Sequence, residues 1–189
     1  MLLRAASLAD THAIATALAG LARVGDIIVL AGDMGAGKTA FAQGFGRALG
    51  ITEPITSPTF TLVHSYPCPG KVTLHHADIY RLDSTGDVDE LALSELAEFD
   101  GIVLVEWGDV AATGFGEHLE VRLGNDDLDG DLDIESETES GTDSGTGSDA
   151  GVADEFGLDG ARLIELEATG RSWAGRWDRL TQAMQAFRC

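Results

Sequence analysis

The amino-acid sequence predicts an α/β fold, and three observations support this. Two short apolar runs, Asp26–Ala31 and Gly101–Trp107, are typical of strands that are buried on both faces of a parallel sheet. Amphipathic segments that are typical of helices alternate with these runs. A turn signal at Pro67–Gly70 separates two further strand-like runs, which indicates an antiparallel pair. We therefore expect a mixed, mainly parallel central sheet with an antiparallel strand pair.

The predicted elements follow one another in a regular order. Ser7 and Asp10 are typical of a helix start, because Ser accepts from first-turn amides and Asp favours the positive helix end. That helix ends before Gly25, and the strand at Asp26–Ala31 leads through a glycine-rich turn into a second helix at Lys38–Leu49. The remaining predictions are strands at Phe60–Tyr66, Val72–Tyr80, Gly101–Trp107, Leu119–Leu123 and Arg162–Glu167, and helices at Val88–Phe99 and Trp173–Phe187.

Acidic residues are concentrated in one segment of the chain. Residues 124–160 hold 13 of the 32 acidic residues and no Lys or Arg, so the rest of the chain has 19 acids, 12 bases and a net charge of −7. The segment is rich in Gly, Ser, Thr and Asp, and it has too few apolar residues to offset its ordering entropy. We expect residues 1–123 plus 161–189 to form a single P-loop ATPase domain, with 124–160 as a disordered, low-complexity insert.

The composition also limits the classes of function. An acidic chain lacks the basic footprint of a protein that holds nucleic acid by itself. No apolar run reaches the length of a membrane span, and the N-terminus does not resemble a signal peptide. Cys68 and Cys189 do not form a CxxC pair, so we expect reduced thiols, no zinc site and a cytoplasmic location.

One motif indicates the chemistry. The segment Gly32-Asp33-Met34-Gly35-Ala36-Gly37-Lys38-Thr39 matches the P-loop pattern G-x4-G-K-[ST], between a predicted buried strand and a predicted helix. Glycines let several backbone N–H groups point at phosphate oxygens, and the helix presents its positive end to them. Lys38 is expected to reach the β- and γ-phosphates, and the Thr39 hydroxyl is expected to bind Mg²⁺. The motif therefore predicts a P-loop NTPase fold and binding of a nucleoside triphosphate with Mg²⁺.

A P-loop also requires an acid near the metal, at the end of a neighbouring strand. Glu106 ends an apolar run and is the first candidate for a Mg²⁺ ligand, with a solvated strand-end acid as the alternative. Asp78 is a second candidate for a catalytic role, and pairing with Arg81 or capping of a turn is its alternative. Trp107 follows Glu106 and packs either in the core or near the nucleotide.

Three further features remain open at this stage. His75 and His76 are adjacent on a predicted strand, so they point to opposite faces and do not favour a shared metal. Ser57–Thr61 carries hydroxyls and is typical either of a nucleotide-sensitive switch or of a simple Pro-Thr turn. Arg81 is the best internal candidate for an arginine finger.

Four blocks together resemble the TsaE (YjeE) family: GDMGAGKT at Gly32–Thr39, SPTFTLVHSY at Ser57–Tyr66, HADIYRL at His76–Leu82 and VEW at Val105–Trp107. The resemblance covers about Ser7 to Leu123 and resumes weakly at Arg162–Gly170. Two departures stand out: the acidic segment replaces a short hairpin connection, and Gly108-Asp109 stands where many relatives have a proline.

The resemblance implies a bacterial, Mg²⁺-dependent ATPase that is required to make N6-threonylcarbamoyladenosine at position 37 of tRNA. It implies that ATP hydrolysis resets the TsaD–TsaB complex, that the isolated protein is a weak ATPase, and that tRNA is held through the partners. Lys38 and Thr39 match the P-loop pair, Glu106 matches the magnesium-associated acid, and Asp78 and Trp107 match motif residues that are important for activity. The segment near Thr11 resembles the part of the family that lies near the adenine.

Two other functions fit the P-loop alone. A small-molecule kinase would use the same phosphate site, but the sequence shows no arginine cluster for a second phosphate. A nucleotide-dependent switch module would rely on ordering of Ser57–Thr61 more than on hydrolysis.

Overall fold

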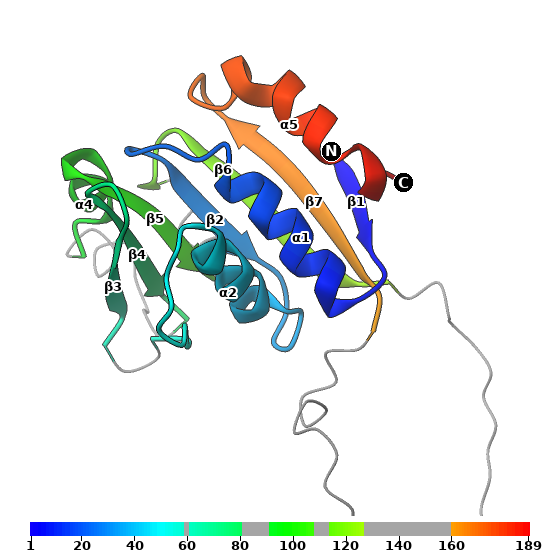
Figure 1. Cartoon of the computed structure of the whole chain (residues 1–189), viewed down its shortest axis with the longest axis horizontal. Helices are drawn as coiled ribbons and strands as arrows, with labels where there is room; N and C mark the ends of the chain where they lie inside the picture. The colour runs from blue at the N-terminus through cyan, green and yellow to red at the C-terminus, as the bar shows by residue number, and fades with distance from the viewer. Residues whose placement is uncertain (59–60, 81–90, 108–113, 127–159) are drawn as a thin grey trace, which may run out of the picture.

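A seven-stranded sheet runs through the computed structural model, in the order β1-β7-β6-β2-β5-β4-β3 (Figure 1). The structure describes residues 1–58, 61–80, 91–107, 114–126 and 160–189. β6, β2, β5 and β4 form a parallel block, whereas β7 and β3 run antiparallel to their neighbours. The α/β class with a mixed sheet is thereby confirmed. The strands are β1 (Leu2–Ala5), β2 (Ile27–Ala31), β3 (Val63–Cys68), β4 (Val72–Asp78), β5 (Gly101–Glu106), β6 (His118–Asn125) and β7 (Arg162–Thr169).

Helices cover both faces of the sheet. The helices are α1 (Leu8–Ala19), α2 (Lys38–Ala48), α4 (Leu93–Phe99) and α5 (Trp177–Ala183), and short 3₁₀ turns at Ala174–Arg176 and Gln185–Phe187 flank α5. Ile28 and Leu30 of β2 pack in one cluster with α1, α2 and α5, whereas Val29 packs in a second cluster with α4 (Figure 1). The alternation follows from the period of two in a strand, and it explains why β2 is apolar at every position.

The helix that precedes β2 begins as its sequence predicts. The Ser7 hydroxyl accepts a hydrogen bond from the Asp10 amide at 3.2 Å, and the Asp10 carboxylate accepts from the Ala6 amide at 2.9 Å. α1 then packs closely on α2, where a Cβ on Gly44 would lie 2.9 Å from the Cα of His12. A side chain at Gly44 would therefore push the two helices apart, although helix propensity alone would favour alanine there.

Several boundaries differ from the prediction. The β3–β4 turn lies after Cys68, because β3 is an edge strand and tolerates Pro67, which lacks an N–H donor. The strand β1 was not predicted, since four residues carry little pattern and its pairing with β7 is long-range. The predicted helix at 88–99 begins at Leu93, and residues 88–90 lie outside the described residues. The closing helix is interrupted by 3₁₀ turns.

A buried ion pair joins the C-terminal segment to the start of β2. The guanidinium of Arg176 donates to both carboxylate oxygens of Asp26, at 2.6 and 2.7 Å, and the two residues are 4% and 5% exposed. The same guanidinium donates to the backbone carbonyls of Leu21 and Ser172 and packs over the ring of Trp173, at 3.9 Å from its centroid. Because both charges are buried, removal of either one would leave the other uncompensated in the protein interior, at a large cost in stability.

The acidic segment is anchored in a β-hairpin. Asn125 of β6 faces Arg162 of β7, and the Asp126 amide donates to the Ala161 carbonyl at 3.0 Å. Gly124 and Asn125, which the composition assigned to the insert, are therefore the last residues of β6. Residues 127–159 lie outside the described residues. We propose that residues 1–123 and 161–189 form a single domain and that the acidic segment is an insert in this hairpin.

Deletion of residues 127–160, with Asn-Gly joining Asp126 to Ala161, is expected to leave folding and nucleotide binding unchanged. The reason is that β6 and β7 already pair up to Asn125 and Arg162, and Asn-Gly favours the two-residue hairpin turn. Thermal melting with and without Mg-ATP measures both properties. A deleted chain that no longer unfolds cooperatively would contradict the proposed domain boundaries.

Candidate nucleotide site

The P-loop follows β2 directly and opens α2. Gly32 has a φ of 125°, and a Cβ at this residue would lie 2.1 Å from the carbonyl oxygen of Leu123 on the neighbouring strand β6. Only glycine fits both the backbone angle and the space. Gly37, with a φ of 101°, is the N-cap of α2 and leaves no side chain over the first amides of the helix. The amides at this helix start are thus available to bind an anion.

The Lys38 side chain is held against the P-loop itself. Its ammonium donates to the carbonyls of Gly32 and Asp33, at 2.7 and 2.8 Å, and lies 3.5 Å from the centroid of the Trp107 ring. Lys38 is only 5% exposed. The two carbonyls and the aromatic face stabilise a charge that would otherwise be costly to bury. The structure therefore places a lysine ammonium within the loop whose amides face the same site.

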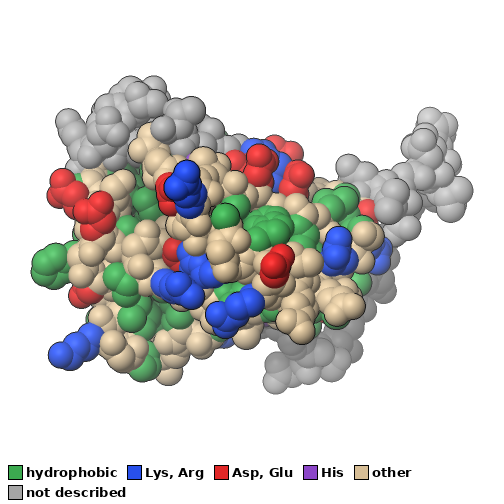
Figure 2. Space-filling view, turned by 90° about the horizontal axis from the view of Figure 1, so that it is seen from above, with side chains coloured by type: hydrophobic (Ala, Val, Ile, Leu, Met, Phe, Trp, Pro, Cys, Tyr) green, Lys and Arg blue, Asp and Glu red, His purple; other side chains and the backbone are tan. Residues whose placement is uncertain are grey.

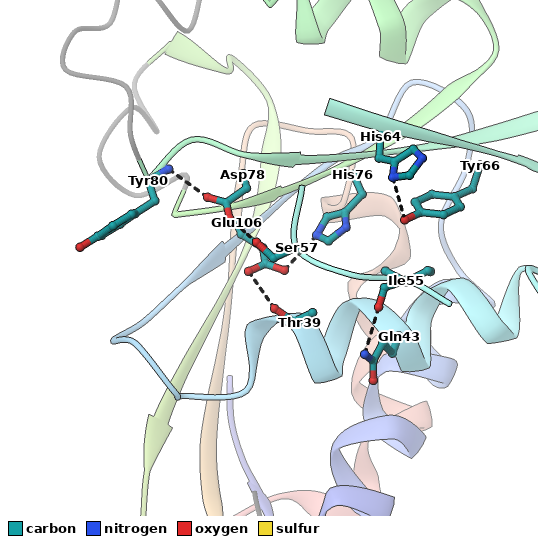
Figure 3. Close-up of polar contacts among 10 residues, drawn as sticks. All are labelled: Thr39, Gln43, Ile55, Ser57, His64, Tyr66, His76, Asp78, Tyr80 and Glu106. Atoms are coloured by element: carbon teal, nitrogen blue, oxygen red, sulfur yellow. Dashed lines mark hydrogen bonds and ion pairs between the residues drawn. The ribbon is translucent and has the colours of Figure 1, made fainter. Parts of the chain in front are cut away.

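The predicted metal-binding pair is brought together by the fold. Glu106 ends β5, which is the parallel neighbour of β2, and Thr39 lies in the first turn of α2. The Thr39 hydroxyl donates to Oε2 of Glu106 at 3.1 Å, as Figure 3 shows. The other carboxylate oxygen, Oε1, accepts from Nε2 of His76 at 2.9 Å, and Glu106 is 2% exposed. Within the described part of the chain, each oxygen of the carboxylate thus has one side-chain hydrogen-bond partner.

Asp78 lies beside Glu106 at the ends of two parallel strands. The two residues are register partners on β4 and β5. Asp78 accepts from the Ser57 hydroxyl through Oδ2 and from the Tyr80 amide at 3.1 Å through Oδ1 (Figure 3). The contact with Ser57 connects the segment after α2 to the strand end, and the contact with Tyr80 is a local turn cap. Arg81 and Thr59 lie outside the described residues, so the alternative pairing with Arg81 and the arginine-finger prediction are not addressed.

Trp107 adopts a backbone conformation that is rare for a non-glycine residue. Its φ is 65°, its amide donates to the Leu30 carbonyl at 2.9 Å, and its ring packs against Tyr80 with centroids 4.7 Å apart. Left-handed φ at a large residue costs energy and persists only where surrounding contacts impose it. Here it turns the indole back over Lys38. The indole therefore contacts the P-loop lysine and also packs against the core cluster that contains Val29.

The donor set suits Mg²⁺ bound together with phosphates. A hydroxyl and a carboxylate are hard oxygen ligands, and Mg²⁺ is usually held by one or two carboxylates plus substrate phosphates. Among the described residues, no three His, Cys, Asp or Glu side chains are grouped so that they could hold a metal ion. His75 and His76 point away from each other, since His75 contacts Ser65 and His76 contacts Glu106. Thr39 and Glu106 would therefore hold the metal only with the nucleotide present.

Comparison with known proteins agrees with this geometry. The family model described as "Threonylcarbamoyl adenosine biosynthesis protein TsaE" matches residues 5–137. The chain belongs to the TsaE family. The matched residues include the P-loop, Asp78, Glu106 and Trp107.

Relatives of the TsaE family align with part of the chain. Three of them carry the name "tRNA threonylcarbamoyladenosine biosynthesis protein TsaE". The protein from Bacillus subtilis (strain 168) is 44% identical over 98 residues, a match that spans 52% of this chain and 60% of the relative's length. The protein from Treponema pallidum is 40% identical over 58% of this chain and 79% of its own length. The protein from Mycobacterium tuberculosis (H37Rv) is 40% identical over 60% and 73%.

A solved structure agrees with the TsaE family fold. The crystal structure of Bacillus subtilis YdiB superposes with a TM-score of 0.63 at 27% identity, and the match covers 98% of this chain and 94% of that one. The superposition thus extends over both the P-loop half and the C-terminal strands and helices.

Thr11, which the TsaE resemblance placed near the adenine, is 3% exposed. Its hydroxyl donates to the Ser7 carbonyl at 3.3 Å, within the first turn of α1. None of its described contacts joins it to the P-loop. The adenine assignment for Thr11 therefore stays a prediction.

His12 follows Thr11 in α1. Burial lowers the pKa of the His12 imidazole, and the Arg47 guanidinium lowers it further.

Two residues at this site were not predicted. His76 contacts Glu106, because it lies two residues before Asp78 and so on the same face of β4. Arg162, which is 6% exposed, places its Nε 3.8 Å from where a Cβ on Gly37 would lie. The period of two in the strand points to His76 once β4 and β5 are known to pair. For Arg162 the sequence offers no signal, since its position depends on the β6–β7 hairpin.

Proposed function

We propose that this chain is the ATP-binding and ATP-hydrolysing subunit of the machinery that makes N6-threonylcarbamoyladenosine at position 37 of tRNA, and that its hydrolysis resets a TsaD–TsaB complex. Membership of the TsaE family supports the pathway. The observation that supports hydrolysis is the contact of Thr39 with Glu106 directly beside the lysine of the P-loop. In this arrangement the groups that a P-loop ATPase requires lie on neighbouring elements.

The proposed reaction is in-line attack of water on the γ-phosphate. Bound Mg²⁺ would neutralise charge on the β- and γ-phosphate oxygens. Lys38 and the amides at the start of α2 stabilise the charge that develops on the transferred phosphoryl group. Glu106 and Thr39 would hold the metal, and Asp78 would orient either the water or the segment that carries Ser57. Arg162 lies beside Gly37 and donates to the carbonyls of Gly160 and Ala161. We expect slow hydrolysis until a partner protein supplies a further positive charge.

The charge of the chain supports indirect contact with tRNA. Lysine and arginine side chains lie among acidic and hydrophobic ones on the face that Figure 2 shows, and the net charge is −20. Such a surface attracts a phosphate backbone only weakly. We therefore propose that partner proteins hold the tRNA and that the chain acts in the cytoplasm. Among the described helices, none has the length and apolar character to cross a membrane.

Turnover measurements test this function. Phosphate release from ATP is compared for the chain alone, with a purified TsaD–TsaB pair, and with a panel of nucleosides and small metabolites. Stimulation by the protein pair alone is expected. Phosphate transfer to a small metabolite would instead identify a kinase, and tight ATP binding without turnover under any condition would identify a switch module.

Glu106→Ala is expected to remove the Mg²⁺ dependence of ATP hydrolysis and to lower kcat by about 10²–10³-fold, the usual effect of losing one group that stabilises the transition state. Mg²⁺ titrations of the hydrolysis rate measure this change. Asp100→Ala, which removes a strand-flanking acid far from the P-loop end of β5, is the control. Retained Mg²⁺ dependence in Glu106→Ala would assign the metal to Asp78 instead.

A further inference from the structure

His76 lies completely inside the protein, next to the acid of the nucleotide site. It belongs to β4, its ring is 0% exposed, and its Nε2 is 2.9 Å from Oε1 of Glu106 (Figure 3). Its register partner on β5 is Leu104, and Asp78 and Glu106 are the next pair on the same face. The imidazole therefore stands behind the carboxylates, on the side away from the end of the sheet.

The hydrogen bonds of this ring indicate which nitrogen donates. A carboxylate oxygen accepts, so Nε2 of His76 carries the proton that faces Glu106. The other nitrogen, Nδ1, is buried and has no hydrogen-bond partner among the described residues. The ring thus makes a single polar contact with the rest of the site, and that contact is with Glu106.

The contact restricts how the Glu106 carboxylate is oriented. Thr39 donates to Oε2 and His76 donates to Oε1, so each carboxylate oxygen is held by a different donor. Without His76, the carboxylate would be free to rotate about its last bond and to offer either oxygen, or neither, to Thr39. Partners of this kind orient metal-binding side chains in many proteins, and their loss weakens metal binding by about 10–100-fold.

We propose that His76 is a positioning residue, which holds the Glu106 carboxylate in the orientation that binds Mg²⁺ together with Thr39. The proposal rests on the proposed function, because it assigns a metal to Glu106. It goes beyond that function in naming a group that touches neither the nucleotide nor the metal and yet sets the affinity for Mg²⁺.

Two substitutions of His76 distinguish a hydrogen bond that orients Glu106 from a side chain that only fills space in the core. The amide nitrogen of Gln in His76→Gln reaches about as far as Nε2 and still donates to Glu106, whereas the shorter Asn in His76→Asn does not. His75→Asn is the matched control, since its amide nitrogen replaces the Nδ1 that contacts Ser65 on the other face of β4. Melting curves establish that each variant is folded, and Glu106→Gln marks the effect of losing the carboxylate.

Calorimetric titration then measures ATP affinity at a series of Mg²⁺ concentrations. For His76→Asn we expect the Mg²⁺ concentration at half-maximal enhancement to rise about 10-fold or more, with the affinity for ATP in EDTA unchanged. For His76→Gln and His75→Asn we expect values within about threefold of the wild type. Folded His76→Asn with the Mg²⁺ requirement of the wild type would overturn the proposal, and so would an equal loss in both His76 variants.

The same titration separates the two levels of the argument. If the wild type binds ATP equally well with Mg²⁺ and with EDTA, or if Glu106→Gln matches the wild type, the metal assignment in the proposed function fails and the role of His76 fails with it. If Glu106→Gln requires more Mg²⁺ while His76→Asn does not, only the role of His76 is refuted.

Discussion

Lys38→Ala is expected to abolish the thermal stabilisation of the protein by Mg-ATP. The substitution removes the cation that would contact the β- and γ-phosphates, and two charge-assisted hydrogen bonds are worth about 3–6 kcal/mol together, or at least 100-fold in affinity. It also removes the two contacts that brace the loop through the carbonyls of Gly32 and Asp33. Melting temperatures with and without millimolar Mg-ATP measure the loss, because stabilisation follows the ratio of ligand concentration to Kd.

Lys71→Ala provides the matched control for this result. Lys71 is the other lysine of the chain and lies exposed in the turn between β3 and β4. Its replacement leaves the site unchanged, so the full melting shift should remain. An undiminished shift in Lys38→Ala would place the nucleotide somewhere other than the P-loop.

Arg176→Met is expected to reduce the free energy of unfolding by about 3–5 kcal/mol, because it leaves the Asp26 carboxylate buried without a positive charge, with the Arg23 amide as its remaining donor. For a chain of 189 residues this corresponds to a fall in Tm of roughly 10 °C. Denaturant unfolding monitored by circular dichroism measures the change. Arg179→Met, on the exposed side of α5, should change stability by less than about 0.5 kcal/mol.

A double variant tests the physical reason. Replacing both partners, Asp26→Leu with Arg176→Met, removes the unpaired charge and should recover most of the lost stability. Equal destabilisation by the single and the double variant would show that packing around Trp173 or the hydrogen bond from the Arg23 amide, and not the unpaired charge, accounts for the loss.

The sequence predicts those parts of the fold that have a strong local pattern. The apolar run before Gly32 and the capping side chain of Ser7 specify β2 and the start of α1 without knowledge of their neighbours. β1 is different, because its four residues form a strand only through pairing with β7, about 160 residues away in the chain. Pro67 misled the placement of the turn, since its tolerance depends on β3 being at the edge of the sheet.

In the candidate site, too, some residues are predicted by local sequence patterns and others depend on long-range pairing. The motif at Lys38 and Thr39 and the acid at the end of an apolar strand, Glu106, are local signals, and the fold brings Thr39 and Glu106 within hydrogen-bond distance. The contact of His76 with Glu106 depends on the register between β4 and β5, which no local pattern determines. The role of His76 was therefore missed although the residue lies in a quoted block, whereas Lys38, Thr39 and Glu106 were predicted from local signals.

The indole that packs over Lys38 gives the nucleotide site an optical label of its own. The chain has three tryptophans, and the other two, Trp173 and Trp177, lie in the C-terminal segment, where Trp173 is completely buried. Movement of the lysine ammonium from the face of Trp107 to a phosphate would change the electric field at one fluorophore and leave the other two unaffected. Emission from the unmodified protein would then follow the arrival of ATP in real time, and Trp107 would have to be retained in any variant used for such measurements.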